Sequence, residues 1–179
     1  MNKKVIHLFG PSGAGTSSIG RYIAGRMNAF FMDTDDYFWA PTDPPFTTKR
    51  AVSDRLTLIQ KDFDAHEYAV LAGSLVGWGD ELIPQFTLAV RVETDTAVRL
   101  ERLRARERAR FGDRIDPGGD MYENHKEFIE WAALYDEGGI EMRSKARHDE
   151  WQKLLKCPLV CVDGSLPLEE NWGIIKRYL

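Results

Sequence analysis

A glycine-rich segment, Gly10 to Ser17, has the spacing of a phosphate-binding loop. It reads Gly-Pro-Ser-Gly-Ala-Gly-Thr-Ser and fits the frame G-x-x-x-x-G-K-[ST] at every position but one. Glycines let the backbone curl until successive N–H groups face a bound anion, and the start of the following helix adds positive partial charge. The hydroxyl of Ser17 occupies the position that coordinates Mg²⁺ in this frame. We therefore expect phosphate contacts from Gly10, Ser12, Gly13, Ala14, Gly15, Thr16 and Ser17.

Thr16 stands at the one position where the frame has a lysine. That lysine brings positive charge to the β- and γ-phosphates of a nucleotide. Losing one preorganised donor of this kind typically costs on the order of 10²–10³ in rate. The sequence leaves three explanations open: another cation replaces the lysine, the reaction is slow, or the protein binds a nucleotide without turning it over.

An arginine-rich helix is the first candidate source of that charge. Between Arg99 and Arg114 the chain has seven arginines against three acidic residues, which gives a local charge of +4 in a chain of formal charge −4. Helical spacing places Arg99, Arg102, Arg106 and Arg110 on one face. The alternatives are a solvated helix face and an RNA-binding surface. Net negative charge and the lack of interleaved aromatic residues disfavour a nucleic-acid partner.

Two carboxylates, Asp33 and Asp35, follow an apolar run and lie two residues apart. In an extended strand end, this spacing points both side chains to one side. Phosphoryl transfer needs a carboxylate that holds Mg²⁺ or its waters, and it gains from a second one that orients or deprotonates an attacking hydroxyl. We assign the first role to Asp33 and the second to Asp35. The alternative is turn chemistry, because Asp-Thr-Asp-Asp also suits a loop.

Aromatic and basic residues follow these carboxylates. Tyr37-Phe38-Trp39 lies in a proline-rich segment, and Trp78 follows the third predicted strand. These rings could line a pocket for a flat ring of a ligand, or they could pack as a small cluster beneath the loop. Arg50 and Arg55 could bind a substrate anion, with surface exposure as the alternative.

The other elements alternate between strand and helix. Short apolar runs that end in glycine or aspartate predict strands, and apolar residues at intervals of three and four predict helices. This alternation predicts an α/β fold in which helices cover both faces of a parallel sheet and ligands bind at the carboxyl ends of the strands. We expect strands at residues 5–9, 29–32, 68–72, 86–92 and 159–162, helices at 17–27, 52–63, 94–110, 121–135, 140–155 and 168–178, and loops after residue 33 and at 111–120.

Composition places the chain among ordinary globular proteins. Its 179 residues are 43% hydrophobic and 29% charged, which suits one domain and excludes a mostly disordered chain. No apolar run approaches the roughly 18 residues of a membrane span, and the apolar run after Met1 is too short for a signal peptide. Cys157 and Cys161 cannot form a disulfide framework, and we expect two reduced core thiols in a cytoplasmic protein.

Taken together, these motifs resemble the small P-loop kinases, a group that includes adenylate kinase and shikimate kinase. The resemblance rests on the phosphate loop, the Asp33-Thr34-Asp35 strand end, Gly73, the arginine-rich helix and the glycine-containing loop at 111–120. Segments 33–39, 41–50 and 112–121 look like a bacterial branch labelled adenylate-kinase-like or AAA-family ATPase. The resemblance implies a three-layer P-loop NTPase fold with a five-stranded parallel sheet. It also implies a single domain over 1–179 with an acceptor-binding segment at 36–65 and a lid at 111–120.

The resemblance also implies roles for single residues. Shikimate kinases carry Asp-x-Asp at this strand end, where the first aspartate serves the metal and the second touches the acceptor hydroxyl, which matches Asp33 and Asp35. Adenylate kinases carry two arginines at the lid entrance. Arg110 and Arg114 match them, which implies adenine stacking and phosphate contact. Arginines beyond the lid reach phosphates in that family as well, which makes Arg143 and Arg147 further candidates here.

The activity implied is phosphoryl transfer from ATP, with Mg²⁺, to a small molecule. The aromatic residues favour a nucleoside or nucleotide as acceptor, followed by a polyol or hydroxy acid. A true adenylate kinase is not expected, because the Asp-Gly-Phe-Pro-Arg segment is missing. The alternative is a nucleotide-binding regulator with little or no turnover. We expect no membrane partner, and the sequence leaves the oligomeric state open.

Overall fold

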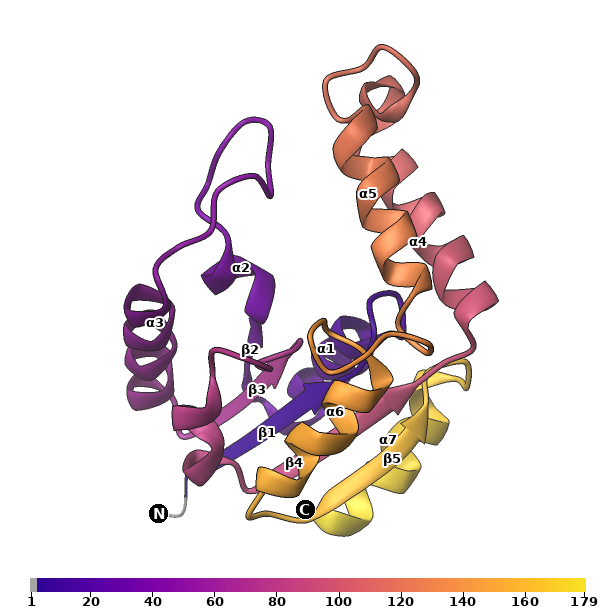
Figure 1. Cartoon of the computed structure of the whole chain (residues 1–179). Helices are drawn as coiled ribbons and strands as arrows, with labels where there is room; N and C mark the ends of the chain where they lie inside the picture. Colours follow the sequence, from indigo (N-terminus) through magenta and orange to yellow (C-terminus); the bar gives the residue numbers. More distant parts are fainter. Residues whose placement is uncertain (1–2) are drawn as a thin grey trace.

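A five-stranded sheet forms the centre of the protein, and its strands are all parallel (Figure 1). The structure is a computed structural model that describes residues 3–179. The strand order is β2-β3-β1-β4-β5, so the predicted parallel α/β sheet is confirmed. The strands are β1 (Lys4–Phe9), β2 (Phe30–Asp33), β3 (Tyr68–Ala72), β4 (Leu88–Glu93) and β5 (Leu159–Asp163).

Helices cover both faces of this sheet and make the predicted three layers (Figure 1). Apolar side chains of these helices pack against the strands in two separate clusters, one on each face. One face is covered by α1 (Thr16–Met27) and α7 (Leu168–Ile175), and the other by α3 (Val52–Ala65) and α6 (Lys145–Trp151).

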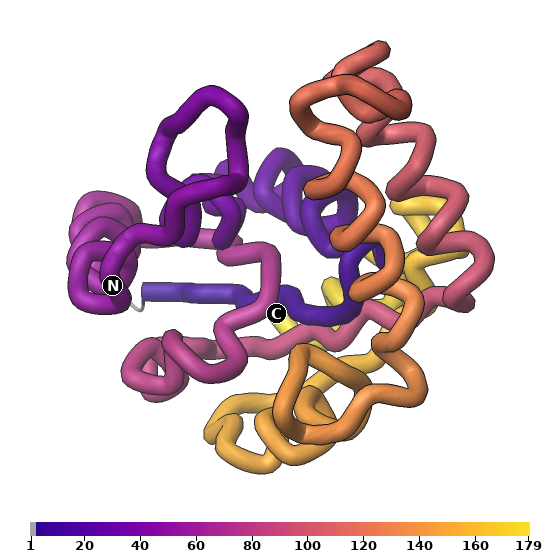
Figure 2. Tube along the Cα trace, turned by 45° about the horizontal axis from the view of Figure 1, so that its top comes forward, coloured from indigo at the N-terminus to yellow at the C-terminus, as the bar shows by residue number. Residues whose placement is uncertain are grey.

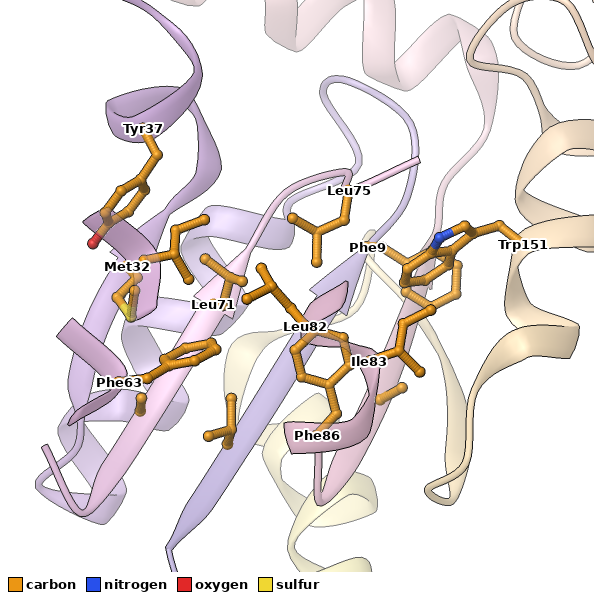
Figure 3. Close-up of a cluster of buried hydrophobic side chains, with 14 residues drawn as sticks. Phe9, Met32, Tyr37, Phe63, Leu71, Leu75, Leu82, Ile83, Phe86 and Trp151 are labelled. Carbon is orange, nitrogen blue, oxygen red and sulfur yellow. The ribbon is translucent and has the colours of Figure 1, made fainter. Parts of the chain in front are cut away.

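The central strand shows why the chain folds this way. Side chains alternate along β1, so Ile6 and Leu8 join the cluster under α1 while Phe9 joins the opposite one. Figure 3 shows that second cluster, in which Phe9 packs with Trp151 of α6 and Phe63 of α3 contributes from the far side. All residues of β1 after Lys4 are buried, which is the pattern of a strand covered on both faces.

A long hairpin of α4 (Thr96–Phe111) and α5 (Tyr122–Ala133) rises from the carboxyl edge of the sheet (Figure 1). Leu103 packs between the two helices with Ile129 and Ala132. A second small cluster of Phe111, Ile115 and Met121 holds the tip. The segment that the sequence suggests as a lid, 111–120, is therefore the tip of a helical hairpin.

Several element boundaries differ from those predicted. The expected loop after residue 33 begins with a short helix, α2 (Thr34–Phe38), because the Asp33 carboxylate caps it. The expected helix at 140–155 begins only at Lys145, where the Ser144 hydroxyl accepts a hydrogen bond from the Arg147 N–H at 3.0 Å. Residues 80–85 form a 3-10 helix, so β4 begins at Leu88 instead of residue 86.

Both cysteines are free thiols. The expectation that both lie in the core is wrong for Cys161, which is exposed on the edge strand β5, whereas Cys157 is half-buried. No helix within residues 3–179 is long and apolar enough to cross a membrane.

Candidate active site

The segment Gly10–Ser17 forms the turn from β1 into α1, at the carboxyl edge of the sheet. Gly13 and Gly15 have φ angles of 81° and 103°, in the left-handed region that favours glycine. At Gly13 there is also no room for a side chain, since a Cβ atom would lie 2.7 Å from the Arg99 carbonyl oxygen. The glycine spacing is thus required by the backbone geometry of the loop.

Residues of the turn after β4 and of α4 fix the loop through its carbonyl groups. The Thr94 hydroxyl donates to the Ala14 carbonyl at 3.0 Å, and Arg99 Nη1 donates to the Ser12 carbonyl at 3.2 Å. By contrast, the structure gives no hydrogen-bond acceptor within residues 3–179 for the backbone N–H groups of Gly15, Thr16 or Ser17. Free N–H groups at a helix start are the donors that bind an anion.

The side chains of Ser17 and Asp33, both assigned to the metal, meet directly. Ser17 Oγ donates to Asp33 Oδ2 at 2.6 Å, and Asp33 Oδ1 accepts the backbone N–H of Asp35 at 3.1 Å. Both are hard oxygen donors of the kind that Mg²⁺ prefers. In the part of the chain that the structure describes, no group of three His, Cys, Asp or Glu residues could hold a metal. Water and phosphate oxygens would therefore have to complete the coordination of the ion.

Asp35 lies in the first turn of α2, where part of the residue is exposed although its carboxyl group is desolvated by the protein around it. The pKa of its carboxyl is raised, first by the protein that surrounds it and then by the charge of Asp33, while Arg143, Arg106 and Arg110 oppose the shift. Three arginines, from the hairpin and from the segment beyond it, therefore lie near enough to act on the charge of this carboxylate. A raised pKa also makes Asp35 a better proton acceptor.

Arg143 brings positive charge to the phosphate loop. Its Nη2 donates to the Ser12 hydroxyl at 2.5 Å, and its guanidinium lies 4.5 Å from the ring centre of Trp131. Its Nε is buried and has no hydrogen-bond partner among residues 3–179. Burial lowers the pKa of the guanidinium, and the nearby Asp35 carboxylate opposes this shift.

The two lid arginines contact the segment at 36–65 instead of the phosphate loop. The Arg110 guanidinium lies 5.6 Å from the ring centre of Phe46. Arg114 Nη2 donates to Asp120 Oδ2 at 2.6 Å and to Asp43 Oδ1 at 2.8 Å. Figure 2 shows the loop that carries these partners and the hairpin on either side of the phosphate loop. The side chains of Arg110 and Arg114 therefore connect the hairpin with the segment at 36–65.

The aromatic residues hold an arginine. Arg55 lies 3.9 Å from the ring centre of Phe38 and 5.3 Å from that of Trp78. Its Nε donates to the Arg50 carbonyl at 2.9 Å, and only 6% of the residue is exposed. The aromatic rings also pack on one another, Trp39 against Phe38 at 4.9 Å among them. The alternative that Arg55 is exposed at the surface is therefore wrong. The aromatic rings form a cluster around it.

Two features of the site were not visible in the sequence. Arg99, placed on the cationic helix face, is fully buried and donates to the carbonyl groups of Thr94 and Ser12, so it stabilises the backbone. His148, which belongs to no sequence motif, shares hydrogen bonds with the hydroxyl groups of Tyr135 at 2.8 Å and Ser74 at 3.1 Å. These contacts lie in the buried layer beneath the site. Only three-dimensional packing brings these residues together.

The fold is shared with P-loop small-molecule kinases. A gluconokinase from Sinorhizobium meliloti 1021 matches 99% of this chain and 90% of its own, with a TM-score of 0.51 and 21% identity. A shikimate kinase from Acinetobacter baumannii, in complex with shikimate, matches 99% of this chain and 96% of its own, with a TM-score of 0.51 and 14% identity. At these identities the similarity establishes the fold.

Sequence similarity places the chain more narrowly. It is 40% identical over 177 residues to the protein YqaC of Bacillus subtilis (strain 168), which covers 99% of this chain and 98% of that protein. The chain therefore belongs to the family of YqaC. No model of a known protein family matches it.

Proposed function

We propose that this protein transfers the γ-phosphoryl group of ATP to a hydroxyl group of a small molecule, with Mg²⁺ as cofactor. The observation that supports this most is the 2.6 Å hydrogen bond from Ser17 Oγ to Asp33 Oδ2. It joins the phosphate loop to the carboxylates at the end of β2. The phosphates of ATP would lie on Gly10–Ser17, against backbone N–H groups that have no acceptor in the part of the chain that the structure describes.

Ser17 and Asp33 would hold the Mg²⁺ ion. Their oxygens are adjacent and of the right chemical type, so the residues present fit the ion. When bound, Mg²⁺ supplies charge neutralisation at the β- and γ-phosphates.

Asp35 would serve the acceptor. The acceptor oxygen attacks the γ-phosphorus and forms a new O–P bond, while the bond between that phosphorus and the β,γ-bridging oxygen breaks and ADP leaves. The proton of the acceptor hydroxyl passes to the Asp35 carboxylate. Catalysis would otherwise be positioning and charge stabilisation, as is usual for this reaction class.

The two segments beside the phosphate loop would enclose the substrates. We assign acceptor binding to residues 36–65 and lid movement to residues 111–120. Arg110 and Arg114 sit at the base and in the first turn of that tip. In our proposal they contact the phosphates once Arg114 exchanges Asp43 for the nucleotide.

The surroundings of Arg55 favour an acceptor that carries an anion. Its guanidinium is nearly buried between aromatic rings, and its hydrogen bond goes to a neutral carbonyl group. Asp35 and Phe38 lie three residues apart on α2, a spacing that puts both on one side of the helix. An acceptor whose anionic group binds Arg55 would thus present its hydroxyl group to Asp35. A hydroxy acid fits this arrangement directly, and a nucleotide is the second class.

Thr16 supports a second candidate function, a nucleotide-binding regulator without turnover. Such a protein would bind ATP through the same loop and lack the lysine that accelerates transfer. The two candidates differ in product formation and share nucleotide binding.

The test is transfer of label from γ-labelled ATP with Mg²⁺ to separate pools of hydroxy acids, polyols, nucleosides and nucleoside monophosphates. Labelled product in one pool supports the kinase and identifies its acceptor class. ATP binding in the same samples without product in any pool would favour the regulator and contradict the kinase.

A further inference from the structure

We infer that Arg143 replaces the missing lysine of the phosphate loop and binds the β- and γ-phosphates of ATP from outside the loop. This inference rests on the proposed function, because it concerns the donor nucleotide of that reaction. Thr16 leaves the frame Gly10–Ser17 without its own cation. A cation of another element must then approach the loop if the charge is supplied at all.

Arg143 touches the loop through a side chain. Its Nη2 lies 2.5 Å from the Ser12 hydroxyl oxygen, across 131 residues of chain. Within the described residues 3–179, no carboxylate lies within 4.0 Å of its guanidinium nitrogens. The Nε is buried without a hydrogen-bond partner. A guanidinium held in this way lacks a directly paired carboxylate, and a phosphate oxygen would supply such a partner.

The position of Arg143 also matches the reaction. It contacts the phosphate loop at Ser12 and lies close enough to Asp35 for their charges to affect each other's pKa values. The transferred phosphoryl group must pass between the loop and the acceptor hydroxyl at Asp35. Positive charge between these two points would stabilise the charge on the equatorial oxygens during transfer.

The segment before α6 holds Arg143 in place. The Ser144 hydroxyl donates to the Gly139 carbonyl at 2.7 Å, and the Lys145 N–H donates to the Tyr135 carbonyl at 2.8 Å. The ring of Trp131 lies against the guanidinium at 4.5 Å. These contacts orient the side chain before any ligand binds, which preserves the electrostatic benefit of the charge.

Other arginines near the loop are already engaged. Arg99 is fully buried and donates to backbone carbonyl groups. Arg102 Nη1 donates to the Gly164 carbonyl at 3.0 Å. Arg114 is paired with Asp43 and Asp120 at the hairpin tip. Arg143 alone among these four contacts a side chain of the phosphate loop.

The experiment compares binding of ATP and AMP, with Mg²⁺, to wild type, Arg143→Ala and the double variant Thr16→Lys/Arg143→Ala. AMP lacks the β- and γ-phosphates, so it reports every other contact of the nucleotide. We expect Arg143→Ala to weaken ATP binding roughly 10- to 100-fold, the loss typical of one charge-assisted hydrogen bond, and to leave AMP binding unchanged. A lysine at position 16 should restore most of the ATP affinity.

Arg104→Ala is the matched control, because it removes one exposed positive charge from α4 and should change the affinity for neither ATP nor AMP. Thermal unfolding of each variant checks that it folds. Equal ATP affinity in wild type and a folded Arg143→Ala would overturn the inference and leave the proposed function standing. A wild-type protein that binds no ATP would overturn the proposed function and this inference together.

Discussion

The hydroxyl of Ser17 lies 2.6 Å from a carboxylate oxygen of Asp33, and this contact joins the two halves of the site. Ser17 is in the first turn of α1, after β1, whereas Asp33 ends β2. These strands are not neighbours, since β3 lies between them. The contact therefore depends on the parallel sheet, which brings the carboxyl ends of its strands to one edge.

Asp33 should set the Mg²⁺ dependence of nucleotide binding. Asp33→Asn keeps an amide oxygen that can cap α2 but removes the negative charge. We expect the Mg²⁺ concentration needed for half-maximal ATP binding to rise about 10-fold or more, since a charge-assisted contact is lost. A Mg²⁺ titration of ATP binding measures this. Asp36→Asn, in the same helix turn, is the control, and identical titration curves for both variants would contradict the metal role.

Arg55 should determine the affinity for the acceptor. Arg55→Met keeps an unbranched side chain between Phe38 and Trp78 but removes the charge. We expect the KM of the acceptor to rise roughly 10- to 100-fold with ATP affinity unchanged. Steady-state kinetics with the identified acceptor measures the effect. A KM equal to that of wild type would show that Arg55 is a structural arginine of the aromatic cluster.

Asp43 should compete with the nucleotide for Arg114. Its carboxylate lies 2.8 Å from Arg114 Nη2, and the Asp43 side chain is largely exposed while that of Arg114 is partly exposed. Asp43→Asn would free one side of the guanidinium while the pair with Asp120 remains. We expect ATP affinity to increase about two- to five-fold, consistent with the small free energy of an exposed ion pair. Weaker ATP binding in Asp43→Asn would instead mean that this pair supports the site.

Two buried histidines should make the protein sensitive to mild acid. Burial lowers the pKa of His7 and of His148 from 6.5 to about 3, so both rings are neutral in the folded protein. The unfolded chain binds these protons below about pH 6.5, so stability is complete above that pH and is lost as pH falls toward 3. Within this window, each ring should lower the free energy of unfolding by about 1.4 kcal/mol for every unit by which the pH falls.

Urea unfolding between pH 7 and pH 4 measures this dependence. His148→Gln retains hydrogen-bonding groups opposite Tyr135 and Ser74 but does not titrate. The variant should be less stable at pH 7. Its free energy of unfolding should change with pH about half as steeply as that of wild type. A free energy of unfolding that stays constant from pH 7 to pH 4 in wild type would contradict the assignment of neutral buried rings.

Local patterns were sufficient for the fold and for part of the site. The apolar run of β1 and the glycine spacing after it define a strand, a turn and a helix start within 25 residues, so short-range physics determines them. The Asp-x-Asp spacing likewise placed Asp33 beside the loop. The spacing does not predict that Asp33 caps a helix, because an aspartate serves a turn, a helix cap and a metal equally well.

Contacts between distant segments could not be predicted in this way. Arg143 and Ser12 are 131 residues apart, and no periodicity links them. Arg55 looks like any exposed helix arginine in sequence, and only the packing of Phe38 and Trp78 shows that it is buried. Helix spacing also placed Arg99 with the functional arginines, although its depth in the fold gives it a structural role.

The most direct measurement is phosphoryl transfer by wild type and Asp35→Asn, with ATP binding followed in the same samples. Asn keeps the size of the side chain and cannot accept the proton. We expect a loss of transfer on the order of 10²–10⁴-fold, the usual contribution of a general base, while ATP still binds. Wild-type activity should also fall in acid with a midpoint above the ordinary pKa of an aspartate, because the pKa of Asp35 is raised. Equal transfer rates for the two proteins would contradict the mechanism.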